Sequence, residues 1–330
     1  MNFTPGNSLR PSLSLAKTTI GRYIPKKYYP SEIRSDIGYR FMNKGYFSNL
    51  ANLDELKRTE EHFIDRFFDS RNEYENIVGE LYSSDIPELL VNAEDEFPNR
   101  YELYDGNRQI CERYFAYIRK HKPEIVVESG VHNGVSTLLV LFALSLNGSG
   151  TLYSVSHPDE SKHARPQTFD EFKGEYNFSE VTPAARGRPS CAEPGSYGVP
   201  ENKEIGWIVP DEYRDRWEHH VGDPVTVLPS LLEELGTIDL FIHDSHHSIS
   251  DMLFEFTLAF GWLQDGGAIF SHHICWNEAF STFIQEHDCE FGFIDVDLAS
   301  GNAQRYTILR CAGYIVANKA DYQSYQQGSS

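Results

Sequence analysis

Short apolar blocks recur along the second two-thirds of the chain, and turns and helical patterns separate them. Five blocks have strand length: 125–128, 151–155, 219–221, 238–244 and 268–271, of which all but 219–221 are mainly apolar. Apolar residues at helical spacing follow three of these blocks: 136–146, 228–235 and 248–263. Strands that alternate with helices indicate an α/β fold with a doubly wound, mostly parallel sheet.

The N-terminal third has a different pattern. Apolar residues among charges from Asp54 to Leu81 predict one or two amphipathic helices, packed on the body or on a second subunit. Residues 82–106 read as an acidic loop, and a further helix is predicted from Arg108 to His121. We therefore expect an N-terminal arm and a helical accessory region over 1–106.

The remaining chain is expected to form one domain over 107–318, followed by a flexible tail over 319–330. Near its end, 291–296 and 305–309 read as an antiparallel hairpin. An irregular stretch at about 157–210, rich in Pro, Gly, Ser and charge, interrupts the strand–helix pattern. A connection of this length is typical of a functional lid or of a disordered insert.

The segment Glu124 to Thr137 joins the first predicted strand to a helix through a glycine-bearing turn. Such a turn places backbone N–H groups at a helix N-terminus, where α/β sheets hold small cofactors. The dinucleotide pattern Gly-x-Gly-x-x-Gly is absent, and the spacing is instead Glu128-x-Gly130-x-x-x-Gly134. An acidic residue there suits a cofactor that carries a cationic amino group.

Composition narrows the function classes. The chain has 330 residues and a net charge of -20, which disfavours nucleic acid as a partner. Its five cysteines show no paired spacing, which favours a reducing compartment. No apolar run approaches the roughly 20 residues needed to span a bilayer, and no signal-peptide pattern opens the chain. We expect a cytoplasmic protein without a membrane partner.

Five segments occur in an order typical of one enzyme class: Val127–Gly134, Gly150–Val155, Gly222-Asp223, Ile238–Asp244 and Trp262–Phe270. With them, roughly 123–309 resembles the class I S-adenosylmethionine-dependent methyltransferases. Within that class it is similar to small-molecule O-methyltransferases related to macrocin O-methyltransferase. The resemblance implies a Rossmann-like, seven-stranded sheet whose last hairpin is antiparallel.

The resemblance also implies roles for residues at the strand ends. Glu128, Gly130 and Gly134 would line the methionine part of S-adenosylmethionine. Asp223 would contact the adenine end, although it also reads as a helix N-cap. Relatives have an acid at the end of the second strand, which binds the ribose hydroxyls, whereas this chain has Ser156. A serine can hydrogen-bond one hydroxyl but cannot clamp two.

A metal is the second implied group. Asp244 would be its first ligand, and His272 and His273 stand where metal-dependent relatives have two adjacent acids. One carboxylate with two imidazoles prefers Fe, Mn or Zn over Mg. Because adjacent strand residues point to opposite faces, both histidines reach one ion only if the strand has turned. Otherwise they are hydrogen-bonded at a pocket rim. His247 would be a catalytic base, or else a solvated loop histidine.

The expected function is therefore O-methyl transfer to a small hydroxylated metabolite, such as a sugar or natural product, with or without a divalent metal. One alternative is a metal-dependent hydroxylase or hydrolase that uses the Asp/His/His set on the same fold. Another is a non-catalytic homologue that binds a metabolite or partner, which the serine at position 156 suggests. A homo-oligomer through the N-terminal helices is a further expectation.

Overall fold

A computed structural model describes residues 61–95, 108–157, 199, 202–274, 279–287, 289–300 and 306–317. Residues 1–60 of the expected N-terminal region, most of the 157–210 stretch and the 319–330 tail lie outside these residues. The strands are β1 (Ile125–Ser129), β2 (Thr151–Ser156), β3 (Trp217–Val221), β4 (Ile238–His243), β5 (Leu263–Ser271), β6 (Glu290–Ser300) and β7 (Tyr306–Val316). The helices are α4 (Arg71–Tyr82), α5 (Ile86–Asp95), α6 (Arg108–His121), α7 (Val135–Asn147), α11 (Pro224–Leu235), α12 (Ile249–Trp262) and α13 (Ala279–His287), with the 3-10 helix η3 (Asp211–Arg216).

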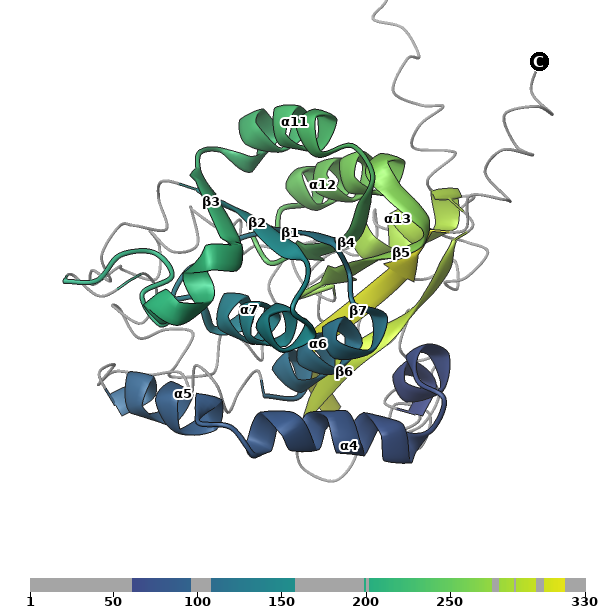
Figure 1. Ribbon diagram of the computed structural model, residues 1–330. Helices are drawn as coiled ribbons and strands as arrows, with labels where there is room; N and C mark the ends of the chain where they lie inside the picture. Colours follow the sequence, from purple (N-terminus) through teal and green to yellow (C-terminus); the bar gives the residue numbers. More distant parts are fainter. Residues whose placement is uncertain are drawn as a thin grey trace, which may run out of the picture.

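The strands form one sheet in the order β3-β2-β1-β4-β5-β7-β6. Strands β1 to β5 pair in parallel, and β7 pairs antiparallel with both β5 and β6. Helices α6 and α7 cover one face, and α11, α12 and α13 cover the other (Figure 1). This architecture confirms the predicted doubly wound, seven-stranded sheet with an antiparallel last hairpin.

The expected loop over 82–106 is wrong in part, because α5 occupies Ile86–Asp95. Ile86, Leu90 and Ala93 are buried, and their spacing places them on one face of the helix. The helix was not predicted because this apolar stripe is short and lies among acidic residues. Pro87 lies in the first turn, where a missing backbone N–H costs little.

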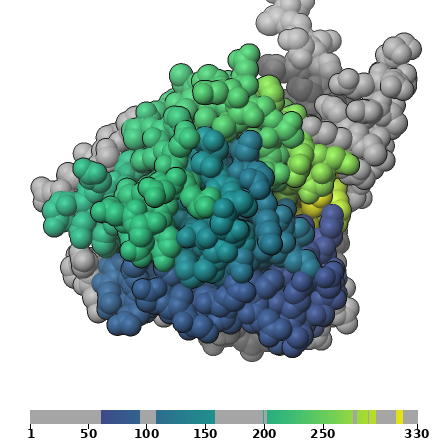
Figure 2. Space-filling model, viewed as in Figure 1, coloured from purple at the N-terminus to yellow at the C-terminus, as the bar shows by residue number. Residues whose placement is uncertain are grey.

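The N-terminal helical residues pack against the sheet of the same chain. Residues 61–67 are helical, and the Phe63 ring lies 6.1 Å from the Phe270 ring of β5 and 6.0 Å from the Tyr314 ring of β7. Phe67 meets the same two rings edge-on. Figure 2 shows the blue N-terminal segments lying directly against the teal region of the chain. These aromatic residues therefore belong to the core of the chain itself.

Among the described residues, no helix combines the length and the apolar character needed to cross a bilayer.

Replacement of Phe63 by alanine is expected to destabilise the whole domain, because its fully buried ring bridges the helical segment and the sheet. The expected loss is about 3–5 kcal/mol in the free energy of unfolding. Val91→Ala, at a half-exposed position of α5, is the control and should change stability by less than about 0.5 kcal/mol. Urea unfolding measures both values, and equal stabilities of the two variants would contradict this packing.

Candidate functional site

The ends of β1 and β4 meet at the middle of the sheet. The chain leaves β1 through α7 on one face and leaves β4 through α12 on the other, so a crevice is expected between these strand ends. The backbone N–H of Asp244 donates to the Ser129 carbonyl at 2.8 Å. Gly130 has a φ of 94°, and a Cβ there would overlap the Asp244 carbonyl oxygen. The glycine thus permits the close approach of the two loops.

Glu128 lies fully buried at the end of β1 and faces the start of α7. Its carboxylate accepts hydrogen bonds from Ser136 Oγ at 2.9 Å, Thr137 Oγ1 at 2.8 Å and Ser154 Oγ at 2.8 Å. The indole N–H of Trp217 donates in turn to Ser154 Oγ at 2.9 Å. These bonds fix the first turn of α7 against β1 and β2. The cofactor role of Glu128 stays a prediction.

The last part of the expected lid folds onto the glycine turn. Gly206 N–H donates to the His132 carbonyl at 2.9 Å, and the Trp207 indole donates to Asn133 Oδ1 at 2.7 Å. A Cβ on Gly134, whose φ is 90°, would stand 2.9 Å from Gly206 Cα. Residues 202–210 therefore pack on the glycine turn after β1, where we expect a cofactor. Burial lowers the pKa of His132 in that turn to about 4, so its ring is neutral.

Ser156 is buried at the end of β2 and is paired with a residue that sequence reasoning missed. Its Oγ lies 2.8 Å from Nε2 of His219 on β3, whose ring stacks on Trp217 at 5.0 Å. Burial lowers the pKa of His219, and the nearby His220 and Arg214 lower it further. The parallel pairing of β2 with β3 brings Ser156 and His219 together, and the strand pattern alone did not show that register.

Asp223 is the N-cap of α11. Its carboxylate accepts from the Val225 N–H at 2.9 Å, and the side chain is otherwise exposed at the end of β3. This geometry bears out the helix-cap interpretation. The contact with an adenine ring remains a prediction.

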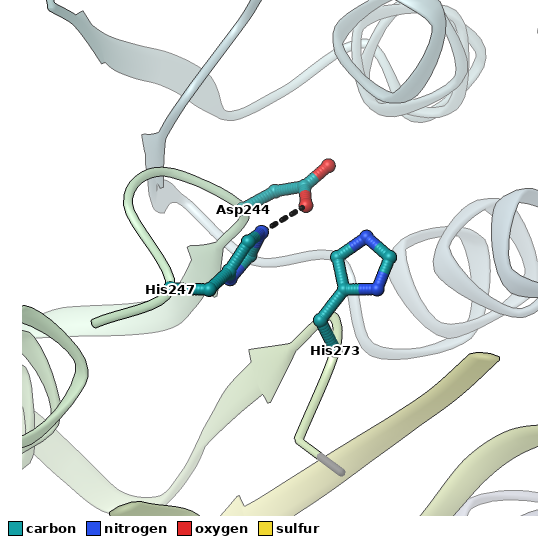
Figure 3. Close-up of side chains that lie close together, drawn as sticks. All are labelled: Asp244, His247 and His273. Atoms are coloured by element: carbon teal, nitrogen blue, oxygen red, sulfur yellow. Dashed lines mark ion pairs between the residues drawn. The ribbon is translucent and has the colours of Figure 1, made fainter. Parts of the chain in front are cut away.

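Three side chains converge beside the turn, from the loops after β4 and β5 (Figure 3). One ligand atom each from Asp244, His247 and His273 lies within 4.8 Å of the others. His247 Nε2 is 3.6 Å from Asp244 Oδ1, and the His247 and His273 rings are 4.7 Å apart. The strand has ended at Ser271, and His273 has a φ of 50°. The chain has therefore left the regular strand at His273.

His272 occupies a different place from its neighbour. Its Nδ1 lies 3.6 Å from Asp244 Oδ1, while its ring meets the Tyr114 ring of α6 edge-on at 5.6 Å. The side chain is almost fully buried. The converging set is thus Asp244, His247 and His273, in which His247 stands where we had expected His272.

The His247 ring is buried among other histidines. Burial lowers its pKa well below the usual range, and His273, His243 and His272 lower the pKa further. Its ring is consequently neutral, which is the form that ligates metals and accepts protons. A carboxylate with two imidazoles suits a borderline transition metal.

A buried histidine–glutamate contact beneath this cluster was not predicted from the sequence. His243 Nδ1 lies 2.8 Å from Glu255 Oε2, and both side chains have essentially no exposed surface. A glutamate on the apolar face of a helix was the available signal, at position 255 between Met252 and Phe256.

Residues 127–274 match the family model described as "Methyltransferase domain". Residues 127–274 form a methyltransferase domain. The matched segment begins in β1 and ends just after His273, so it contains the glycine turn and all three residues of the converging set. No curated protein matches the chain.

Solved structures of low identity resemble parts of the chain. The O-methyltransferase from Bacillus cereus in complex with SAH is 12% identical, with a TM-score of 0.39, and the match covers 80% of this chain and 100% of that one. A putative O-methyltransferase from Klebsiella pneumoniae is 11% identical, with a TM-score of 0.39, and the match covers 80% and 98%. Likenesses of this size carry no argument, so the methyltransferase domain rests on the family match.

Position 130 requires glycine for two reasons, its left-handed φ and the close approach of the Asp244 backbone. Comparison of Gly130→Ala with Gly148→Ala separates these two effects. Both positions have positive φ, but only Gly130 has backbone where a Cβ would stand. Left-handed φ alone is expected to cost each variant about 1–2 kcal/mol. The overlap with Asp244 should cost Gly130→Ala at least about 1 kcal/mol more. Chemical unfolding measures the difference, and equal losses would refute the close approach of the two loops.

Proposed function

We propose that the protein is an S-adenosylmethionine-dependent O-methyltransferase that acts on a hydroxyl of a small metabolite. One observation carries the proposal: within the methyltransferase domain, Asp244, His247 and His273 converge directly beside the glycine turn that follows β1. A cofactor on the turn and an acceptor at the cluster would then be neighbours. Methyl transfer needs this arrangement, because the protein mainly holds donor and acceptor in line.

The glycine turn supports a sulfonium cofactor. It leads into α7, whose first N–H groups suit the carboxylate of a methionine moiety. The neutral ring of His132 places no opposing charge in the turn. We assign the ribose end to Ser156 with His219, and the adenine end to Asp223, which stand at the next two strand ends.

The reaction that we propose is an in-line displacement. The acceptor oxygen forms a bond to the methyl carbon, the carbon–sulfur bond breaks, and S-adenosylhomocysteine leaves with the bonding electron pair. The hydroxyl proton would pass to the His247 ring in the absence of a metal, or to solvent water if a bound metal has acidified the hydroxyl. A divalent metal, when bound, would lower the pKa of the acceptor hydroxyl. Asp244, His247 and His273 would hold this metal. His272, whose Nδ1 lies 3.6 Å from Asp244 Oδ1, would help to orient the Asp244 carboxylate.

His247 has two roles open to it in this scheme. As a ligand it completes the converging set; without a metal, its neutral ring would take the hydroxyl proton. We propose the ligand role, because its Nε2 already lies within reach of the atoms of Asp244 and His273.

The donor set itself favours one other candidate. Two histidines and a carboxylate also form the facial triad of non-haem iron oxygenases. Such an enzyme would need iron but no S-adenosylmethionine. Binding of S-adenosylhomocysteine therefore separates the two functions.

Calorimetry with S-adenosylhomocysteine tests the cofactor. The wild-type protein should bind it, and Ser156→Ala should bind it more weakly by about 0.5–1.5 kcal/mol, the worth of one neutral hydrogen bond. Ser230→Ala removes an exposed hydroxyl on α11, away from the strand ends, and should bind like wild type. A wild-type protein that shows no binding at millimolar ligand would sink the proposal.

Elemental analysis of protein purified without chelator tests the metal. We expect stoichiometric Fe, Mn or Zn in the wild type and in the control variant His62→Ala. His62 is exposed and distant in sequence from the three proposed ligands. His273→Ala should lose the metal, because it removes one of three ligands. Should the wild type carry no metal while it binds S-adenosylhomocysteine, His247 acts as a base in a metal-free reaction.

A further inference from the structure

Glu255 is a carboxylate in an apolar setting. It lies on the inner face of α12 with Met252, Phe256 and Ala259, and only 1% of its surface is exposed. A charge taken out of water costs several kcal/mol unless its surroundings compensate it. Apolar packing would serve the helix at least as well, so the glutamate calls for an explanation beyond stability.

Its partners come from the two strand ends at the centre of the sheet. Oε1 accepts from Ser129 Oγ at 3.1 Å and from Ser245 Oγ at 2.6 Å. Oε2 lies 2.8 Å from His243 Nδ1. Ser129 ends β1, His243 ends β4 and Ser245 lies in the loop that follows β4. One side chain of α12 thus ties both strand ends to the same point.

Asp244 stands between two of these anchors. Its neighbours on either side, His243 and Ser245, are both held by Glu255, and its own N–H donates to the Ser129 carbonyl. The His243 ring also meets the His247 ring edge-on, 5.3 Å away. Asp244 and His247 face one another in Figure 3. Their orientation therefore depends on the hydrogen bonds by which Glu255 holds the loop that carries them.

We propose that Glu255 is a positioning residue of the site, and that its carboxylate aims Asp244 and His247 at the point where His273 converges. The inference rests on the proposed function in one respect, the metal that those three residues would hold. Side chains that orient metal ligands typically contribute 10–100-fold to metal affinity. Glu255 would act through the backbone on Asp244, and through the His243 ring on His247.

Titration with Co²⁺, followed by its visible absorption, tests the proposal. Glu255→Gln keeps the volume of the side chain but replaces a carboxylate oxygen that accepts hydrogen bonds from these partners with an amide N–H₂ group. We expect Co²⁺ to bind it roughly 10–100-fold more weakly than wild type, while affinity for S-adenosylhomocysteine is unchanged. Glu233→Gln removes an equal charge from the exposed face of α11 and should match wild type in both measurements. A variant that binds Co²⁺ as tightly as wild type overturns the proposal.

A second readout keeps positioning separate from the proposed function. If the wild-type protein binds no Co²⁺, the metal part of the proposed function fails. The positioning role of Glu255 is then tested by the NMR signals of the His247 and His273 rings. They should shift in Glu255→Gln and not in Glu233→Gln; unchanged signals overturn the proposal. Should Glu255→Gln fail to fold, the double variant Ser129→Ala, Ser245→Ala removes two donors and is expected to change the same readouts.

Discussion

The site depends on how closely β1 and β4 end beside one another. Gly130 has no side chain, so the loop after β1 can touch the backbone of Asp244. The Asp244 N–H completes the approach by donating to Ser129. With a larger residue at 130, the glycine turn and the Asp244 loop would move apart. A cofactor on one and an acceptor on the other would then lose the alignment that an in-line displacement needs.

Polar groups buried around this contact make the strand ends rigid. Glu128 is satisfied by three hydroxyls on the α7 side of the sheet, and Glu255 by two hydroxyls and an imidazole on the α12 side. Each carboxylate joins a helix to strand ends through side-chain hydrogen bonds, in addition to the apolar packing between them. Hydrogen bonds of this kind favour one arrangement of the strand ends, because another arrangement would leave the buried carboxylate oxygens without partners.

Much of the fold could be predicted from the sequence, and less of the site. Apolar blocks gave the parallel strands, because buried strands need continuous apolar residues. The pattern did not show α5, whose stripe of Ile86, Leu90 and Ala93 is short and set among acids. Asp244 and His273 were expected to lie together because both stand at strand ends, and the structure brings their side chains together. The pairings of Ser156 with His219 and of Glu255 with His243 depend on strand register and helix rotation, which residue types alone do not specify.

A crystal structure of the protein soaked with S-adenosylhomocysteine tests the account most directly. We predict the methionine end on the turn from Glu128 to Gly134, the ribose at Ser156, and the sulfur facing the cluster of Asp244, His247 and His273. A ligand bound away from this turn, or a sulfur directed away from the cluster, would contradict it.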